Sequence, residues 1–194
     1  QLGLEKGWNT NSIFAKSPLD AAIKSMKITQ AFSQANQNPE YERLIEDAVN
    51  HATDLYDKGK FSECTNYVSS KRIGIGFSKE LETISAKAFY QEGMVGQALV
   101  RCIKALDVNS NYGPALKLKE TILAISDEDV HKLVLKDLLN RAKENNLPVI
   151  ESEMEEKALK HANAQMAMVR EIRKNPLVAR DPLFPMKFIR MMNE

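Results

Sequence analysis

The sequence predicts an all-α fold of stacked antiparallel helical hairpins, because one stretch of the chain repeats itself. Residues 45–78 and 79–112 align in register with a period of 34 residues. Similarity at a fixed period of this length is typical of repeats in which each unit is a pair of helices. We therefore expect two hairpins, followed by a third partial copy that starts at Gly113. The aligned pairs are Ala52 with Ala86, Leu55 with Phe89, Tyr56 with Tyr90, Gly59 with Gly93, Phe61 with Val95, Cys64 with Ala98 and Val68 with Cys102.

The residue types at these positions have physical reasons. Small residues such as Ala52 and Ala86 suit places where two helices approach closely, and bulky residues fill the grooves between helix turns. Gly59 and Gly93 fall between the two helix-length segments of each unit. Glycine there supplies the backbone freedom that a tight corner between helices requires. The spacing thus predicts helix, corner and helix in each unit.

The two units resemble the tetratricopeptide repeat (TPR) family. The resemblance is carried by two segments, Ala52-x2-Leu55-Tyr56-x2-Gly59-x-Phe61-x2-Cys64-x3-Val68 and Ala86-x2-Phe89-Tyr90-x2-Gly93-x-Val95-x2-Ala98-x3-Cys102-x2-Ala105. It implies a TPR-like α-solenoid of about two to three repeats, flanked by N- and C-terminal capping helices. The sequence departs from the family pattern at Ala48 and Glu82, where a large residue is usual.

Signals outside the repeats divide the chain into four parts. Residues 1–38 are expected to form an irregular arm and a capping helix, whose start is marked by Ser17-Pro18. Residues 39–146 hold the TPR-like repeats, and residues 147–174 form a C-terminal helix with glutamates at its start and basic residues at its end. Residues 175–194 form an apolar tail that contains three prolines, so most of it cannot be one continuous helix.

Composition excludes several classes of function. The chain has 27 basic and 26 acidic residues, so no overall field attracts nucleic acid. No apolar run is long enough to span a membrane. The two cysteines occupy inward-facing repeat positions and are expected to be buried and reduced, which favours a cytoplasmic location. The chain starts with Gln1 rather than methionine, so we expect a processed product or a piece of a longer protein.

Catalytic motifs are not found in this sequence. His51, His131 and His161 belong to no zinc-binding spacing, and no nucleotide-binding or nucleophile motif is present. Gly74-x-Gly76 is interpreted as a loop between repeats, because no strand precedes it and the third glycine of a phosphate-binding motif is missing. The sequence therefore predicts a chain that is not an enzyme and has no cofactor or metal.

Binding residues are expected on the concave face that the first helices of the repeats would line. Tyr56 and Tyr90, one repeat apart, would form an aromatic ladder for a peptide, or would instead pack between neighbouring helices. A clamp for peptide carboxylates, which chaperone-binding members of the family build from lysine and asparagine, is not expected because Val49 and Thr53 stand at those positions. The candidate residues of the concave face are Thr53, Tyr56, Thr83, Lys87, Tyr90, Gln91, Lys117 and Thr121. The candidate docking residues of the tail are Leu183, Phe184, Phe188 and Ile189.

Two functions of different classes are consistent with these observations. The first is a non-catalytic protein–protein interaction or scaffolding module that binds a peptide, an adjacent domain or a second copy through its concave face and apolar tail. The second is an accessory region of a larger enzyme, since similar repeats accompany bacterial glycan-synthesis glycosyltransferases; catalysis would then belong to another part of that enzyme. Nucleic-acid binding is disfavoured by the balanced charge.

Overall fold

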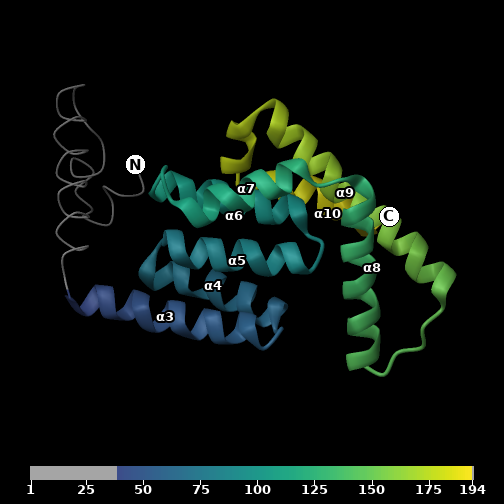
Figure 1. Ribbon diagram of the computed structural model, residues 1–194, viewed down its shortest axis with the longest axis horizontal. Helices are drawn as coiled ribbons and strands as arrows, with labels where there is room; N and C mark the ends of the chain where they lie inside the picture. The colour runs from purple at the N-terminus through teal and green to yellow at the C-terminus, as the bar shows by residue number, and fades with distance from the viewer. Residues whose placement is uncertain (1–38, 194) are drawn as a thin grey trace, which may run out of the picture. The chain divides into compact units, whose positions relative to one another are not determined.

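The computed structural model describes residues 39–193, and the side chains of residues 39–188. The arm and capping helix predicted within residues 1–38 lie outside the described residues. The chain divides into two compact units, residues 1–45 and residues 46–194, and the second unit contains nearly all of the described residues. The described residues contain no strand, which confirms the all-α prediction (Figure 1). Their helices are α3 (Pro39–Asp57), α4 (Phe61–Ile75), α5 (Lys79–Gln91), α6 (Val95–Val108), α7 (Gly113–Ala124), α8 (Asp127–Glu144), α9 (Glu151–Lys174), the 3-10 helix η2 (Pro176–Arg180) and α10 (Phe184–Asn193).

Two helical hairpins follow the predicted register. Gly59 turns the chain from α3 to α4 with a φ of 73°, and Gly93 turns it from α5 to α6 with a φ of 72°. Both angles lie in the left-handed region that favours glycine. Ala52 and Ala86 are fully buried, as the repeat register predicts. The Cys64 thiol donates a hydrogen bond to the Ala52 carbonyl at 3.4 Å, so α3 and α4 approach closely at this point.

Both cysteine thiols are buried and free, as expected. Burial is the main cause that raises the pKa of Cys64 to about 11, and the nearby Glu92 carboxylate adds to the effect. Burial also raises the pKa of Cys102 to about 12. A thiol with so high a pKa is protonated at neutral pH and is a poor nucleophile. The two cysteines therefore act as small packing residues.

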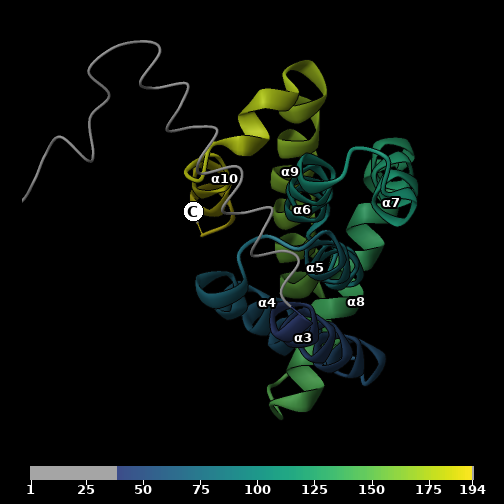
Figure 2. The ribbon, with the colours of Figure 1, turned by 90° about the vertical axis from the view of Figure 1, so that its left-hand side faces the viewer.

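The third unit does not close as a hairpin. In the first two units a glycine makes the corner, but two residues in extended conformation, Ile125 and Ser126, connect α7 to α8. At the repeat spacing, Asp127 occupies the position of Gly59 and Gly93, and α8 begins there. As a result α8 runs across the direction of α4, α5 and α6 and pairs with α9 instead of α7 (Figures 1 and 2).

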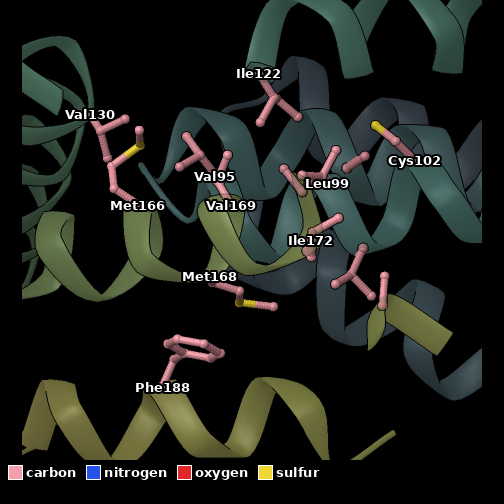
Figure 3. Close-up of a cluster of buried hydrophobic side chains, with 14 of the residues drawn as sticks. Val95, Leu99, Cys102, Ile122, Val130, Met166, Met168, Val169, Ile172 and Phe188 are labelled. Atoms are coloured by element: carbon pink, nitrogen blue, oxygen red, sulfur yellow. The ribbon is translucent and has the colours of Figure 1, made fainter. Parts of the chain in front are cut away.

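Helix α9 joins the second hairpin to the rest of the core. Its apolar side chains pack beside those of α6, α7, α8 and α10 (Figure 3). A fully buried glutamine of α9, Gln165, accepts a hydrogen bond from the Gly96 amide of α6 at 3.0 Å. This amide lies in the first turn of α6, where helical amides have no partner within their own helix. The core residues labelled in Figure 3 are Val95, Leu99, Cys102, Ile122, Val130, Met166, Met168, Val169, Ile172 and Phe188.

The proline-containing tail forms two short helices, η2 and α10, and not one continuous helix. Asn175 ends α9, and its side chain accepts a hydrogen bond from the Leu177 amide to start η2. The Phe184 and Phe188 rings of α10 are 4% and 8% exposed, and their centroids lie 5.2 Å apart. Both belong to the hydrophobic core that α9 shares with α6. Across the part of the chain that the structure describes, no helix is long and apolar enough to cross a membrane.

Candidate functional site

A hollow of about 510 Å³ lies between α5 and α7. We call it the first-helix hollow, because α5 and α7 are the leading helices of their units. Three of the residues predicted for the concave face, Lys87, Lys117 and Thr121, line it together. Its remaining lining residues are Gly113, Pro114 and Leu118.

The first-helix hollow combines apolar walls with two available positive charges. Pro114 and Leu118 supply the apolar wall, and the Lys87 and Lys117 side chains are exposed beside it. The lysine ion pairs among the described residues engage Lys58, Lys60, Lys79, Lys132 and Lys174. Within that part of the chain, Lys87 and Lys117 therefore have no carboxylate of their own. Such a hollow fits a ligand that carries a carboxylate next to an apolar group.

The two tyrosines do not stand free as a ladder. The Tyr56 ring packs against Phe61 with a centroid distance of 5.4 Å, and its hydroxyl accepts a hydrogen bond from Gln91 at 3.5 Å. The Tyr90 ring is half-buried against the hydrophobic core. The packing interpretation of the pair thus fits the geometry better than the ladder. Tyr56 and Gln91, both predicted for the concave face, do come together.

Each threonine of the predicted face donates its hydroxyl to its own helix. Thr53 donates to the Val49 carbonyl at 2.8 Å, and Thr121 donates to the Lys117 carbonyl at 3.0 Å. Thr83 donates in the same way to the Lys79 carbonyl at 2.7 Å and is only 3% exposed. A side chain buried to this degree cannot contact a partner, so Thr83 is not available for binding.

The candidate docking residues of the tail differ in how far their side chains are exposed. Leu183 is 67% exposed. Phe184 and Phe188 are covered by the chain's own core, so their rings are not free to dock a separate partner. The side chain of Ile189 lies outside the described side chains. The tail therefore offers Leu183 and the neighbouring Met186, which is 60% exposed, in place of its two phenylalanines.

Sequence reasoning missed a buried ion-pair network around Glu82. The Arg72 guanidinium of α4 donates to both oxygens of Glu82 at 2.6 and 2.8 Å. The Arg101 guanidinium of α6 adds a contact at 3.5 Å, and the Glu82 side chain is 1% exposed. Burial raises the pKa of the Glu82 carboxyl, while the charges of Arg72 and Lys104 oppose this change. The departure of Glu82 from the repeat pattern was the one signal of this network.

A second polar network ties α8 to the repeat corners. Arg141 of α8 donates to Glu92 at 2.8 Å, and its Nε lies 2.7 Å from an Asp137 carboxylate oxygen. Ser62 of α4 donates to the same Glu92 oxygen at 2.6 Å. A hollow of about 460 Å³ opens beside these groups. Because one arginine is shared by both carboxylates and Ser62 binds Glu92, the network joins α8 to α4 and to the end of α5.

This second network predicts a pH dependence of stability. Burial is the main cause that raises the pKa of Glu92 and of Asp137 in the folded protein. A carboxyl whose folded-state pKa exceeds its unfolded value favours folding most when it is protonated. The stability that this carboxyl contributes to the folded state is lost as the pH rises from about 4 through the folded-state pKa. Glu92→Gln should therefore flatten the decline in the free energy of unfolding over this range, as measured by urea denaturation at successive pH values.

Glu63→Gln is the matched control for this measurement, because Glu63 lines the same hollow but is exposed. It should leave the pH profile close to that of the parent protein. Equal profiles for Glu92→Gln and the parent protein would contradict the role assigned to the Glu92 carboxyl.

The described residues contain no group of three or more His, Cys, Asp or Glu side chains that could hold a metal ion. No protein-family model, curated protein or solved structure matches the chain. Function must therefore be inferred from the surface of the molecule.

Proposed function

We propose that this chain is a non-catalytic protein–protein interaction module whose TPR-like hairpins bind an extended acidic peptide in the first-helix hollow. The observation that carries the proposal is the pair of exposed lysines, Lys87 and Lys117, beside the apolar wall of Pro114 and Leu118. Ammonium groups bind carboxylates through charge-assisted hydrogen bonds. A peptide with acidic residues on both sides of an aliphatic one complements this lining.

The shape of the hollow also favours a peptide over a small metabolite. The hollow is bounded by the exposed surfaces of two adjacent helices, and Gly113 at one end carries no side chain to close it. An open hollow of this kind does not enclose a small molecule, which usually requires a site that buries most of its surface. An extended chain, in contrast, gains affinity from contacts along the length of a groove.

Lys117→Glu is expected to weaken binding of an acidic peptide by about tenfold or more, because it replaces attraction with repulsion at a close charge contact. The measurement is fluorescence anisotropy with peptides selected from a library in which two acidic residues flank one aliphatic residue. Lys136→Glu is the matched control, since Lys136 is exposed on α8 and its substitution changes the net charge by the same amount. Its affinity for the peptide should remain within about twofold of the parent value.

Two outcomes would overturn the proposal. One is that the library yields no peptide that binds the parent protein. The other is that Lys117→Glu and Lys136→Glu weaken binding equally, which would show that the peptide responds to net charge and not to the first-helix hollow.

A further inference from the structure

The corner between α4 and α5 presents exposed apolar residues among basic groups. We call this surface the basic corner and define it by Arg72, Ile73, Phe77 and Lys104. Ile73 is 96% exposed and Phe77 is 54% exposed. The Arg72 guanidinium and the Lys104 ammonium each lie 5.4 Å from the centroid of the Phe77 ring. Cations at this distance are attracted to the ring face, so they hold Phe77 in place at the surface.

The basic corner, together with Arg101 beneath it, carries more positive charge than the buried Glu82 carboxylate neutralises. Arg72, Arg101 and Lys104 all lie near the single Glu82 carboxylate. Burial and the charge of Arg72 lower the pKa of Lys104, while Glu82 opposes this change. Three cations against one carboxylate leave an excess of two positive charges among these four groups. Additional carboxylates placed over Phe77 would relieve the repulsion between the cations.

The corner between α8 and α9 has the opposite character. We call it the acidic corner and define it by Glu144, Leu147, Val149, Ile150, Glu151 and Glu153. Its three apolar residues are 58%, 44% and 50% exposed. Its three glutamates are exposed, and the ion pairs within the described part of the chain do not include them. Lys143 is the one basic residue in the stretch 143–153.

The two corners lie at opposite ends of the unit formed by residues 46–194. Figure 1 shows the loop between α4 and α5 at the left-hand end of α5, and the loop between α8 and α9 at the lower right. In Figure 2 the first of these loops faces the viewer and the second lies on the far side. Since they point away from each other, the two corners of one copy cannot bind each other.

We propose that the chain self-associates head to tail, with the acidic corner of one copy bound to the basic corner of the next. The two surfaces match in charge, and each contains large exposed apolar side chains that association would cover. A contact between two different patches is heterologous, so it leaves one free corner of each kind at the ends of every assembly. Association therefore continues beyond the dimer. Both corners are separate from the first-helix hollow, so self-association does not depend on the function proposed above.

The test uses two variants of the full chain, each with one corner disabled. The first, Ile73→Glu with Phe77→Glu, disables the basic corner without replacing Arg72, Glu82 or Arg101. The second, Glu144→Lys with Val149→Lys, disables the acidic corner. Glu144 ends α8, where a positive charge is favourable, and Val149 is 44% exposed. Sedimentation velocity reports the assembly state, and circular dichroism confirms that each variant folds.

The parent protein should form species that grow with concentration, whereas each variant alone should remain a monomer. An equimolar mixture of the two variants should form a 1:1 heterodimer, because the first retains its acidic corner and the second its basic corner. Raising the salt concentration from about 0.1 M to about 1 M shortens the Debye length from about 10 Å to about 3 Å and should weaken association. Leu183→Glu, which changes an exposed apolar residue outside both corners, should assemble like the parent.

Two results would overturn the inference. A parent protein that stays monomeric up to its solubility limit would show that the corners do not bind. A parent protein that assembles, while the mixture of variants stays monomeric, would show that a different surface is responsible.

Discussion

Gly93→Ala is expected to lower the free energy of unfolding by more than about 4 kcal/mol, an exceptional value for a single substitution. Gly93 has a φ of 72°, which an alanine adopts only with a penalty of about 1–2 kcal/mol. The larger effect is steric. A methyl group at Gly93 would lie 2.6 Å from Cγ2 of Val134, 2.7 Å from its backbone nitrogen and 2.9 Å from its Cα. Backbone atoms cannot rotate away as a side chain does, so α8 as a whole would have to move off the corner.

Gly59→Ala is the matched control for this prediction. Gly59 occupies the same repeat position with a φ of 73°, but a methyl group there would meet no atom within 4 Å. Only the conformational penalty of about 1–2 kcal/mol is expected. Urea denaturation of both variants, followed by circular dichroism, measures the difference. Equal losses of stability would contradict the close packing of α8 on the corner between α5 and α6.

The repeat period predicts the helices and the corner within each unit. It does not predict which other helices pack against that unit. Gly59 and Gly93 are equivalent in the alignment, and both form the predicted corner. Their different surroundings arise because α8 crosses the second corner, and no local pattern encodes that contact. The failure of the third hairpin has a local signal, in contrast. Asp127 stands at the glycine position, and an aspartate favours the start of a helix over a left-handed corner.

The same limit applies to the residues that the sequence places on the concave face. Lys87, Lys117 and Thr121 line one hollow because α5 and α7 lie side by side. Thr83 shares the register position of Lys117 but is buried. Helix α5 is covered by three helices, α4, α6 and α7. Among the described helices, the main contacts of α7 are with two, α5 and α6. Exposure at a repeat position thus depends on neighbours that one sequence period does not specify.

The ion-pair networks show the limit of sequence reasoning most clearly. Glu82 binds arginines that lie 10 residues before it and 19 residues after it, and Glu92 binds an arginine 49 residues away. These separations follow no helical or repeat period. The charges could be recognised as unusual at a core position, but their partners could be identified only from the structure.

Phe184→Ala is expected to lower the free energy of unfolding by about 3–5 kcal/mol, the range for removal of a buried aromatic ring. The Phe184 ring is 4% exposed and packs edge-on against Phe188 in the core shared by α6 and α9. Truncation would leave a cavity beneath α10 and would remove the ring contact that holds α10 on α9. Urea denaturation measures the loss.

Leu183→Ala is the matched control for this prediction, because Leu183 is next to Phe184 in the chain but is exposed instead of buried. Leu183 is 67% exposed, so its truncation should change stability by no more than about 0.5 kcal/mol. The pair of variants separates the two roles that an apolar tail can have. A tail that serves as a docking surface would lose partner binding and keep its stability when Phe184 is truncated. A tail that completes the core would lose stability first, and the burial of Phe184 and Phe188 predicts this second behaviour.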